Sequence, residues 1–241
     1  MAEIQGLLVE GKGKRLYRTD VPGQAILYFK DEAKAYHGLK RGRIIGKGEI
    51  NNAICAHLFT LLRENGVENH FIQKLDARQS LVNVVEIIPV SVVVRNRVAG
   101  NLANRIGYPT GTPLKEPVVE YHLKDEELEN PLINETHIRA MELATREETR
   151  QMTDTALRVN EILSAYMREI QVELIDFRLE FGRYDGRVIL ADEITPDVAR
   201  FWDAATHEPM DLDRFRRDMG EVEENYQELL KRMIGTEYPG L

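Results

Sequence analysis

Short runs of apolar residues separated by turn formers mark the first third of the chain. Within residues 6–36 they predict strands that are joined by a turn at Pro22–Gly23. Apolar residues then recur at helical spacing between Ile50 and Leu62, and Gly66 is placed to end that helix. We therefore expect this part of the chain to combine a sheet with one amphipathic helix.

Two further apolar runs, 70–75 and 81–88, also predict strands. Pro89 has no backbone N–H to donate, so we expect it to break the second run before a strand resumes over 90–94. We place a boundary between two lobes at this proline, with the backbone just before it at the mouth of a cleft. The resulting lobes are residues 1–88 and 89–241.

The second half of the chain predicts one long helix, preceded by an irregular segment. Residues 107–134 are rich in Pro, Gly and turn formers and show few regular patterns. Thr145 opens a capping box, and the apolar stripe of the helix that follows ends at Ile170. Further helical segments are expected from 211 to about 234. Strand runs followed by long helices indicate an α+β fold.

Two strands after the long helix, Leu174–Gly182 and Val188–Ile194, predict a β-hairpin with an Asp-Gly turn. Alternation puts Arg178 and Glu180 on one polar face, and pairing of the strands would bring Glu180 near Asp192. Two adjacent carboxylates repel each other unless a cation lies between them. A Mg²⁺ ion that carries nucleotide phosphates is one interpretation. A solvated sheet face whose acids pair with Arg178 is the other.

Composition narrows the class of protein. The 241 residues are 43% hydrophobic and 30% charged, as expected for a folded globular protein. A formal net charge of −8 disfavours a general nucleic-acid binder, and local basic clusters favour small anionic ligands instead. The single cysteine, Cys55, excludes an internal disulfide. We find neither a membrane-spanning run nor a signal peptide, so a cytoplasmic enzyme is expected.

The segment Gly11-Lys12-Gly13-Lys14 combines backbone that can approach a ligand closely with two charges suited to oxyanions. It is not a Walker A loop, and basic glycine turns also occur on ordinary surfaces. Together with a distant pair of carboxylates it favours an enzyme that uses ATP. These parts do not distinguish a kinase from a ligase.

Two arginine-bearing segments are candidate binding sites for anions. Arg95 and Arg97 follow a hydrophobic strand, and a guanidinium suits a carboxylate or a phosphate. The alternative is a strand end that emerges into solvent. Asp197 and Arg200 lie just after the carboxylate hairpin, where a loop could hold a second substrate. Here the alternative is a structural turn anchored by aromatic residues.

Blocks spread over almost the whole chain resemble the family of phosphoribosylaminoimidazole-succinocarboxamide synthase, or SAICAR synthetase. The blocks are Glu10–Tyr17, Phe29–Glu32, Gly46–Asn52, Glu86–Val90, Val94–Asn96, Pro131–Glu135, Ile175–Gly182, Ala191–Asp197 and Arg200–Asp203. Their number and order make the resemblance far more specific than any one motif.

The resemblance implies an ATP-dependent ligase of purine biosynthesis. Such an enzyme joins the carboxylate of carboxyaminoimidazole ribonucleotide to L-aspartate and releases ADP and phosphate, by way of an acyl phosphate. It also implies a two-lobed fold with a kinase-like N-terminal lobe, ATP in the cleft between the lobes, Mg²⁺ as metal and a homodimer.

Site residues follow from the resemblance by position. Glu180 and Asp192 would hold Mg²⁺, and with Arg178 and Lys14 they are the candidate catalytic residues. The candidate ATP-binding residues are Gly11, Lys12, Gly13, Lys14, Ile87 and Lys124. The candidate substrate-binding residues are Arg95, Asn101, Asp197 and Arg200.

The chain departs from the family pattern mainly on the side of the ribonucleotide and acceptor. The departures are Asn101, Asn104, Asn130, Arg178, and the segment Glu32–Gly38 with Lys34 in place of the usual threonine. They keep open a paralogous ligase that acts on a related heterocyclic carboxylate nucleotide. A regulatory protein without catalysis is a third hypothesis, which the intact lysines and carboxylates disfavour.

Overall fold

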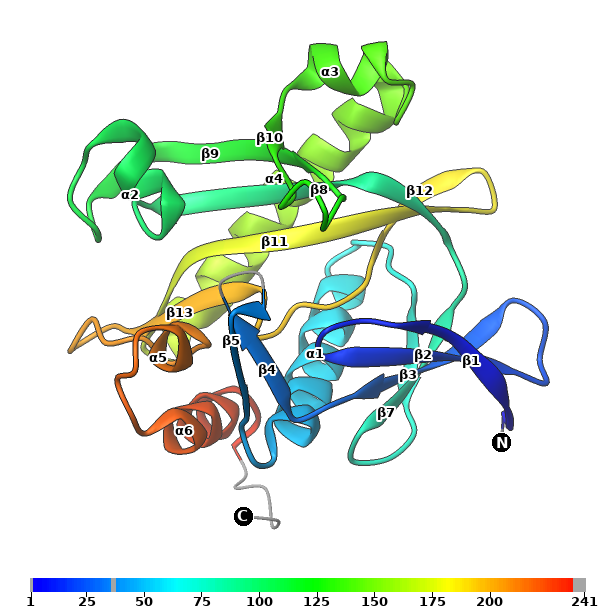
Figure 1. Ribbon diagram of the computed structural model, residues 1–241, viewed down its shortest axis with the longest axis horizontal. Helices are drawn as coiled ribbons and strands as arrows, with labels where there is room; N and C mark the ends of the chain where they lie inside the picture. The colour runs from blue at the N-terminus through cyan, green and yellow to red at the C-terminus, as the bar shows by residue number, and fades with distance from the viewer. Residues whose placement is uncertain (1, 36–37, 236–241) are drawn as a thin grey trace.

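The computed structural model describes residues 2–35 and 38–235 (Figure 1). In it, alternating apolar and polar residues of the N-terminal lobe form a five-stranded antiparallel sheet. Its order is β1-β2-β3-β7-β6. The strands are β1 (Ile4–Glu10), β2 (Lys14–Thr19), β3 (Gln24–Phe29), β6 (Phe71–Lys74) and β7 (Gln79–Asn83). The predicted turn at Pro22–Gly23 connects β2 to β3, and Gly23 has the positive φ, 78°, that favours glycine.

A second, six-stranded sheet forms the other lobe, in the order β10-β9-β8-β11-β12 with β13 also paired to β11. Its strands are β8 (Glu86–Arg97), β9 (Pro113–Leu123), β10 (Leu132–Ile133), β11 (Val172–Tyr184), β12 (Arg187–Ala191) and β13 (Ala199–Asp203). A small hairpin of β4 (Glu32–Ala35) and β5 (Lys40–Arg43) lies between the N-terminal sheet and the C-terminal helices (Figure 1). The mixture of antiparallel sheets and separate helices confirms the α+β prediction.

Three longer helices cover the sheets. The predicted helix over 50–62 is α1 (Lys47–Glu64), and the predicted capping box at Thr145 opens α4 (Arg146–Glu169). The C-terminal segments are α5 (Asp213–Arg216) and α6 (Val222–Ile234), and two short helices are α2 (Asn101–Ile106) and α3 (Glu135–Ala140). None of the helices in the described part of the chain is long and apolar enough to cross a membrane.

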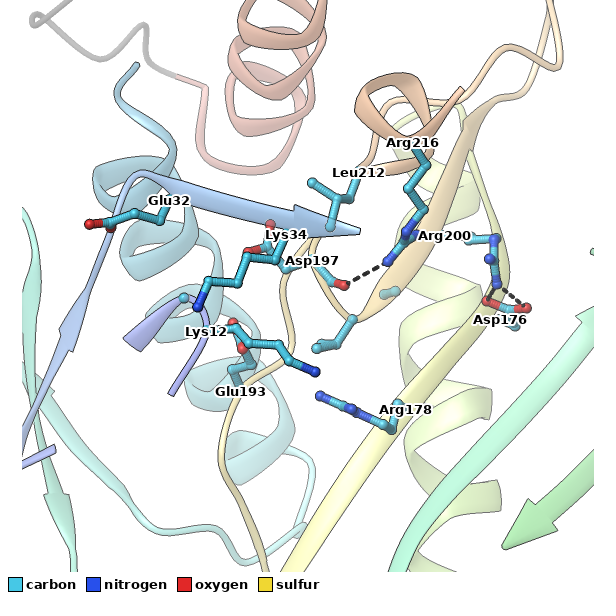
Figure 2. Close-up of a pocket in the computed structure, with 13 residues that line it drawn as sticks. Lys12, Glu32, Lys34, Asp176, Arg178, Glu193, Asp197, Arg200, Leu212 and Arg216 are labelled. Carbon is cyan, nitrogen blue, oxygen red and sulfur yellow. Dashed lines mark hydrogen bonds and ion pairs between the residues drawn. The ribbon is translucent and has the colours of Figure 1, made fainter. Parts of the chain in front are cut away.

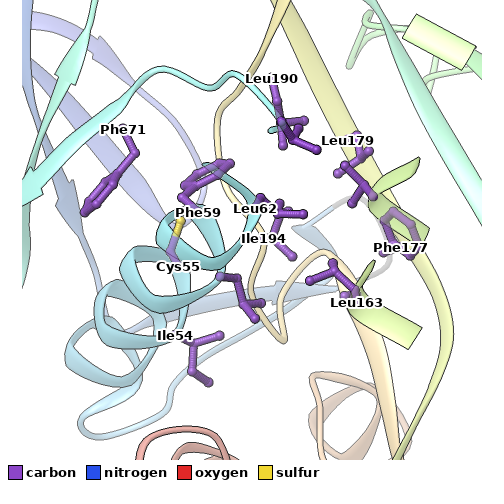
Figure 3. Packing of buried hydrophobic residues seen from close by; sticks show 14 of the residues in the cluster. Ile54, Cys55, Phe59, Leu62, Phe71, Leu163, Phe177, Leu179, Leu190 and Ile194 are labelled. Carbon is purple, nitrogen blue, oxygen red and sulfur yellow. The ribbon is translucent and has the colours of Figure 1, made fainter. Parts of the chain in front are cut away.

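One hydrophobic core extends through both lobes. Figure 3 shows Phe59 of α1 on the side of Phe71 from β6, and Leu163 of α4 with Phe177 of β11 on the opposite side of the same cluster, and all four side chains are buried. Cys55 is buried in the same cluster. Because apolar packing is continuous from one sheet to the other, the core fixes how the two lobes face each other.

The strand break that we predicted at Pro89 is wrong. β8 runs without interruption through Pro89, and the break lies earlier, at Val84–Val85, between β7 and β8. Pro89 is tolerated because the register of β8 against β11 shifts between the pairs Gly182–Ile87 and Glu180–Ser91. Proline, which cannot donate to a ladder, is accommodated at such bulges.

Two other predictions of irregular structure are also wrong. Residues 107–134 contain β9, whose pairing with β8 is irregular only near Pro117, between the pairs Arg97–Pro113 and Arg95–Val118. The expected loop around Arg200 is the strand β13, in which Arg200 lies opposite Asp176 of β11. Prolines and a sharp turn at 195–197 hid two strands that tertiary pairing stabilises.

Candidate functional site

Two cavities lie side by side where the two lobes meet. The apolar cavity, of about 230 Å³, is lined chiefly by aliphatic residues of the N-terminal sheet and the linker to β8. The charged cavity, of about 300 Å³, is lined by acids and bases of β4, β11, β13 and α5. Neighbouring residues of the same segments line different cavities: Gly11 and Lys14 the apolar one, Lys12 and Gly13 the charged one. The glycine-lysine turn therefore separates the two cavities.

The apolar cavity has a hydrophobic roof and a charged floor. Leu16, Leu27 and Val82 contribute aliphatic surface, while Val84 and Ile87 lie at its edge and are 42% and 40% exposed. The floor consists of Lys14, Lys124, Glu180 and Asp192. A flat apolar group would fit the roof, and an oxyanion would lie near the lysines of the floor.

The acidic pair at this floor depends on the turn of the β11–β12 hairpin. Asp185 and Gly186 form a two-residue turn with φ of 47° and 74°, the geometry that Asp-Gly favours. That turn sets the register in which Glu180 lies opposite Ala191, so that Asp192 follows directly after the strand. The hairpin and its Asp-Gly turn are as predicted.

Asp192 reaches this floor by leaving the strand, not by continuing it. β12 ends at Ala191, which corrects the predicted strand end at Ile194. In a regular strand Asp192 would face away from Glu180, because side chains alternate and Ala191 is the residue opposite Glu180. Asp192 instead has a left-handed backbone, φ 65°, which aspartate tolerates better than most residues. Both carboxylates consequently line the apolar cavity.

Each carboxylate of the pair is held by a lysine. Lys14 Nζ lies 2.5 Å from Asp192 Oδ1 and 2.7 Å from Glu193 Oε1, and Lys124 Nζ contacts Glu180 Oε2. Burial disfavours both charges of the Lys14–Asp192 pair, but their mutual attraction outweighs it: the pKa of Lys14 is raised and the pKa of Asp192 is lowered. Glu193 is different, because burial raises its pKa more than Lys14 lowers it.

His70 also lines the apolar cavity and contacts the backbone of the floor. Its Nε2 lies 3.1 Å from the backbone oxygen of Asp192, and the ring is 5% exposed. Burial lowers the pKa of His70 to about 4, so the ring is neutral at neutral pH. A neutral imidazole that donates to this carbonyl holds the bend at Asp192 without adding a charge beside Lys14.

The charged cavity contains Lys12, Lys34, Arg178, Arg200 and Arg216 as cations, and Glu32, Asp176, Glu193 and Asp197 as acids. Figure 2 shows Lys12, Lys34 and Arg178 at one end, and Arg200 with Asp176 at the other. An elongated ligand with anionic groups at both ends would match this distribution of charge.

A row of alternating charges lies behind the Arg200 end. Arg200 Nη1 lies 2.9 Å from Asp176 Oδ2 and its Nε lies 2.7 Å from Asp213 Oδ2. Asp176 also receives Arg95 Nη1 at 2.7 Å, and Arg95 Nε lies 2.8 Å from Glu120. Each guanidinium is thus held by carboxylates on both sides, which fixes its plane.

Asp197 is held from the side away from the cavity. The fully buried Lys47 at the start of α1 places Nζ 2.5 Å from Asp197 Oδ2, and the hydroxyl of Tyr226 donates to Oδ1 at 2.9 Å. A Cβ added to Gly13 would lie 3.4 Å from Asp197 Oδ2, so the tip of the glycine-lysine turn rests on this ion pair. The close approach of the backbone that glycine permits at position 13 is therefore made to Asp197 of the protein itself.

The structure brings most of the predicted site residues together. Gly11, Lys14, Ile87, Lys124, Glu180 and Asp192 line the apolar cavity, and Lys12, Gly13, Arg178, Asp197 and Arg200 line the charged cavity. Arg95 does not line either: it is 6% exposed and lies behind Asp176. Asn101 is exposed at the start of α2, next to Gly100, whose added Cβ would lie 2.6 Å from Arg200 Nη2.

The departures from the family pattern are unequally placed. Lys34 and Arg178 line the charged cavity, whereas Asn104 lies on α2 and Asn130 has a left-handed turn conformation, φ 51°. Tyr36 and His37, which belong to the same departing segment as Lys34, lie outside the described residues.

Several site residues were missed in the sequence. Lys47, His70, Glu193, Asp213 and Arg216 were not singled out as site residues. Only Lys47, in the segment Gly46-Lys47-Gly48, could have been noticed in the sequence. It lies at the start of an apolar helix, and a lysine that is buried there needs an acidic partner. The others became recognisable only through contacts between distant segments.

Comparisons with known proteins find relatives over almost the whole chain. A model of the SAICAR synthetase family matches residues 7–233. A phosphoribosylaminoimidazole-succinocarboxamide synthase from Brevibacillus brevis is 50% identical over 97% of this chain and 98% of its own length. One from Coprothermobacter proteolyticus is 51% identical over 94% and 97%.

Solved structures give the same result for the fold. The crystal structure of a phosphoribosylaminoimidazole-succinocarboxamide synthase from Ehrlichia chaffeensis matches with a TM-score of 0.94 and 37% identity, over 96% of this chain and 100% of that one. A SAICAR synthetase in complex with ADP matches with a TM-score of 0.93 and 40% identity, over 95% and 98%.

Proposed function

This chain belongs to the SAICAR synthetase family, and we propose that its two adjoining cavities divide one ATP-dependent ligation between them. ATP binds in the apolar cavity, with its base under the aliphatic roof and its phosphates toward Lys14 and Lys124. Carboxyaminoimidazole ribonucleotide and L-aspartate bind in the charged cavity. The observation that carries the proposal is the division of the glycine-lysine turn, whose adjacent residues face opposite cavities.

The chemistry that fits this arrangement is activation of a carboxylate. An oxygen of the ribonucleotide carboxylate attacks the terminal phosphorus of ATP, which releases ADP and leaves an acyl phosphate. The amine of aspartate then attacks the acyl carbon, and phosphate departs with the former carboxylate oxygen. Lys12, Lys14 and Arg178 lie at the boundary that this phosphoryl group must cross, where they would offset its charge.

The floor of the apolar cavity fits Mg²⁺ that arrives with a nucleotide. Glu180 and Asp192 provide the hard oxygen donors that this ion prefers. In the described ranges, no group of three or more His, Cys, Asp or Glu forms a cage of protein ligands. This is the pattern expected when phosphates and water complete the coordination. Bound there, Mg²⁺ would neutralise phosphate charge beside Lys14 and Lys124.

The Arg200 end of the charged cavity is assigned to the ribonucleotide and its phosphate. Arg200 lines the cavity, Arg95 supports it through Asp176, and Asn101 lies beside it on α2. An arginine held by two carboxylates keeps its remaining N–H groups oriented for a phosphate. Asp197, held by Lys47, would face the substrates near the glycine-lysine turn.

We also propose lobes of residues 1–88 and 89–241, a homodimer, and a cytoplasmic location where ATP is available. The two sheets separate between Asn83 and Glu86, close to the proposed boundary. Light scattering of the purified protein would test the dimer.

The test of the reaction is ADP release measured with a coupled assay. Release should require Mg²⁺, the carboxylated imidazole ribonucleotide and L-aspartate together, and omission of any one should abolish it. Turnover with another amine but none with aspartate would restore the paralogous ligase, which the relatives at about 50% identity do not favour. No turnover with any amine would point to a regulatory protein.

A further inference from the structure

The β4–β5 hairpin presents one face to the protein core and the other to the charged cavity. Ala33 and Ala35 are buried, and Ala33 packs with Ile44 and Leu212. Because side chains alternate along a strand, Lys34 lies on the opposite face of β4, where it lines the cavity. Its direction is therefore set by the packing of its two neighbours.

The cations of the charged cavity differ in whether they already have an acidic partner. Lys12 pairs with Glu126, Arg178 lies 3.7 Å from Glu180, Arg200 is held by Asp176 and Asp213, and Arg216 contacts Asp213. Lys34 has no hydrogen bond or ion pair within residues 2–35 and 38–235. An unpaired ammonium that lines a cavity is available for an anionic ligand.

Lys34 and Arg200 lie at different ends of this cavity. Figure 2 shows Lys34 beside Lys12, on the far side from Arg200 and Asp176. If Arg200 binds the ribonucleotide phosphate, the opposite end holds the carboxylate that becomes phosphorylated and the amine that attacks it. ATP approaches from the apolar cavity, so the space between the glycine-lysine turn and β4 is left for the amino acid.

We propose that Lys34 is a specificity-determining residue that binds a carboxylate of the L-aspartate acceptor. This inference rests on the proposed function, because it takes the ribonucleotide to bind toward Arg200. L-aspartate carries two carboxylates besides its reacting amine, and an ammonium fixed on a strand can orient one of them while the amine stays free to attack. The threonine usual at this position has no charge and could give only a neutral hydrogen bond.

The experiment is a comparison of steady-state constants for Lys34→Gln, Lys34→Arg and Arg41→Gln. Arg41 lies directly opposite Lys34 in the β4–β5 pair, is exposed, and binds the backbone oxygen of Gly38 without lining the cavity. Arg41→Gln thus removes one positive charge from the same hairpin at nearly the same place. Lys34→Arg retains the charge.

For Lys34→Gln we expect the KM for L-aspartate to rise about tenfold or more, from the loss of a charge-assisted hydrogen bond. The KM values for ATP and the ribonucleotide should stay within about twofold, which also shows that the fold is intact. Lys34→Arg should recover most of the affinity, and Arg41→Gln should behave as the unchanged protein.

The outcomes separate this inference from the proposed function. If the unchanged protein does not use aspartate, the proposed function fails before the variants are compared. If it does, an unaltered KM for aspartate in Lys34→Gln overturns the role of Lys34. A rise confined to the ribonucleotide, or an equal rise in Arg41→Gln, overturns it as well.

Discussion

Residues of the glycine-lysine turn line both cavities, yet the two cavities differ in the side chains that form them. The apolar cavity obtains its shape from aliphatic side chains and concentrates its four charged groups on one floor. The charged cavity is lined by nine ionisable residues, most of them held by partners. The first suits a ligand that is largely flat and apolar with one charged end, and the second suits polar substrates that must be held in one orientation.

This difference predicts that substitutions in one cavity affect catalysis and substitutions in the other affect binding. Charges on the floor of the apolar cavity lie next to the proposed phosphoryl transfer, so their loss should lower kcat. Charges at the far end of the other cavity should mainly alter KM. Two predictions test this division, beginning with the larger effect, and a third tests the residue that supports the floor of the apolar cavity.

Asp192→Asn should lower turnover on the order of a thousandfold, because the substitution removes a charged oxygen ligand from the proposed metal site. Asparagine tolerates the left-handed backbone at this position and Glu193 still pairs with Lys14, so the variant should remain folded and unfold cooperatively, at a lower midpoint because the Lys14–Asp192 attraction is lost. The matched control is Asp185→Asn, which alters an aspartate of similar conformation, φ 47°, in the exposed hairpin turn. Near-normal turnover of Asp192→Asn in the ADP assay would remove the metal assignment.

Arg200→Ala should raise the KM for the ribonucleotide about a hundredfold and leave the KM for ATP nearly unchanged, because Arg200 lines only the charged cavity. Asp176 and Asp213 retain Arg95 and Arg216 as partners, which limits the structural cost. Arg232→Ala is the control, since Arg232 is also half-buried between carboxylates but lies on α6 outside both cavities. Equal weakening of both substrates would contradict the division.

His70→Gln should flatten the dependence of stability on pH. The pKa of His70 is lowered to about 4 from an ordinary 6.5, so the unfolded chain binds more protons between these values. Stability of the unchanged protein should therefore fall as pH drops from about 6.5 to about 5, by about 2 kcal/mol from this residue. The variant should lose most of that slope in urea unfolding at the two pH values. Parallel slopes in both proteins would show that His70 does not titrate as described.

The sequence predicted the elements whose signals are local. Apolar spacing and the capping box at Thr145 identified α1 and α4, and the Asp-Gly turn identified the β11–β12 hairpin. Pro89 and Pro117 misled the interpretation because a proline is excluded only from regular ladders, and both lie at irregular pairings. Whether strand pairing is irregular at a proline depends on the neighbouring strand. The sequence of the segment that contains the proline does not reveal it.

The candidate site was predictable where family blocks supplied it, and less so where geometry decides. Strand alternation alone would have directed Asp192 away from Glu180, and only the left-handed turn at Asp192 brings the two acids to one floor. Lys47 offered only the local signal of a lysine between two glycines, and its contact with Asp197, like the contact of His70 with the backbone of Asp192, became evident only in the structure. Such contacts join residues more than a hundred positions apart.

The backbone contact between the segment before β6 and strand β12 has a mechanical consequence. The N–H of His70 donates to the oxygen of Leu190 at 2.9 Å, and the N–H of Leu190 donates to the oxygen of Glu68 at 3.1 Å. These hydrogen bonds connect the edge of the N-terminal sheet to the residues immediately preceding Asp192. We therefore expect relative motion of the two lobes to be smallest near these two hydrogen bonds and largest at β1, the opposite edge strand of the sheet. Glu180 and Asp192 should keep their alignment during such motion.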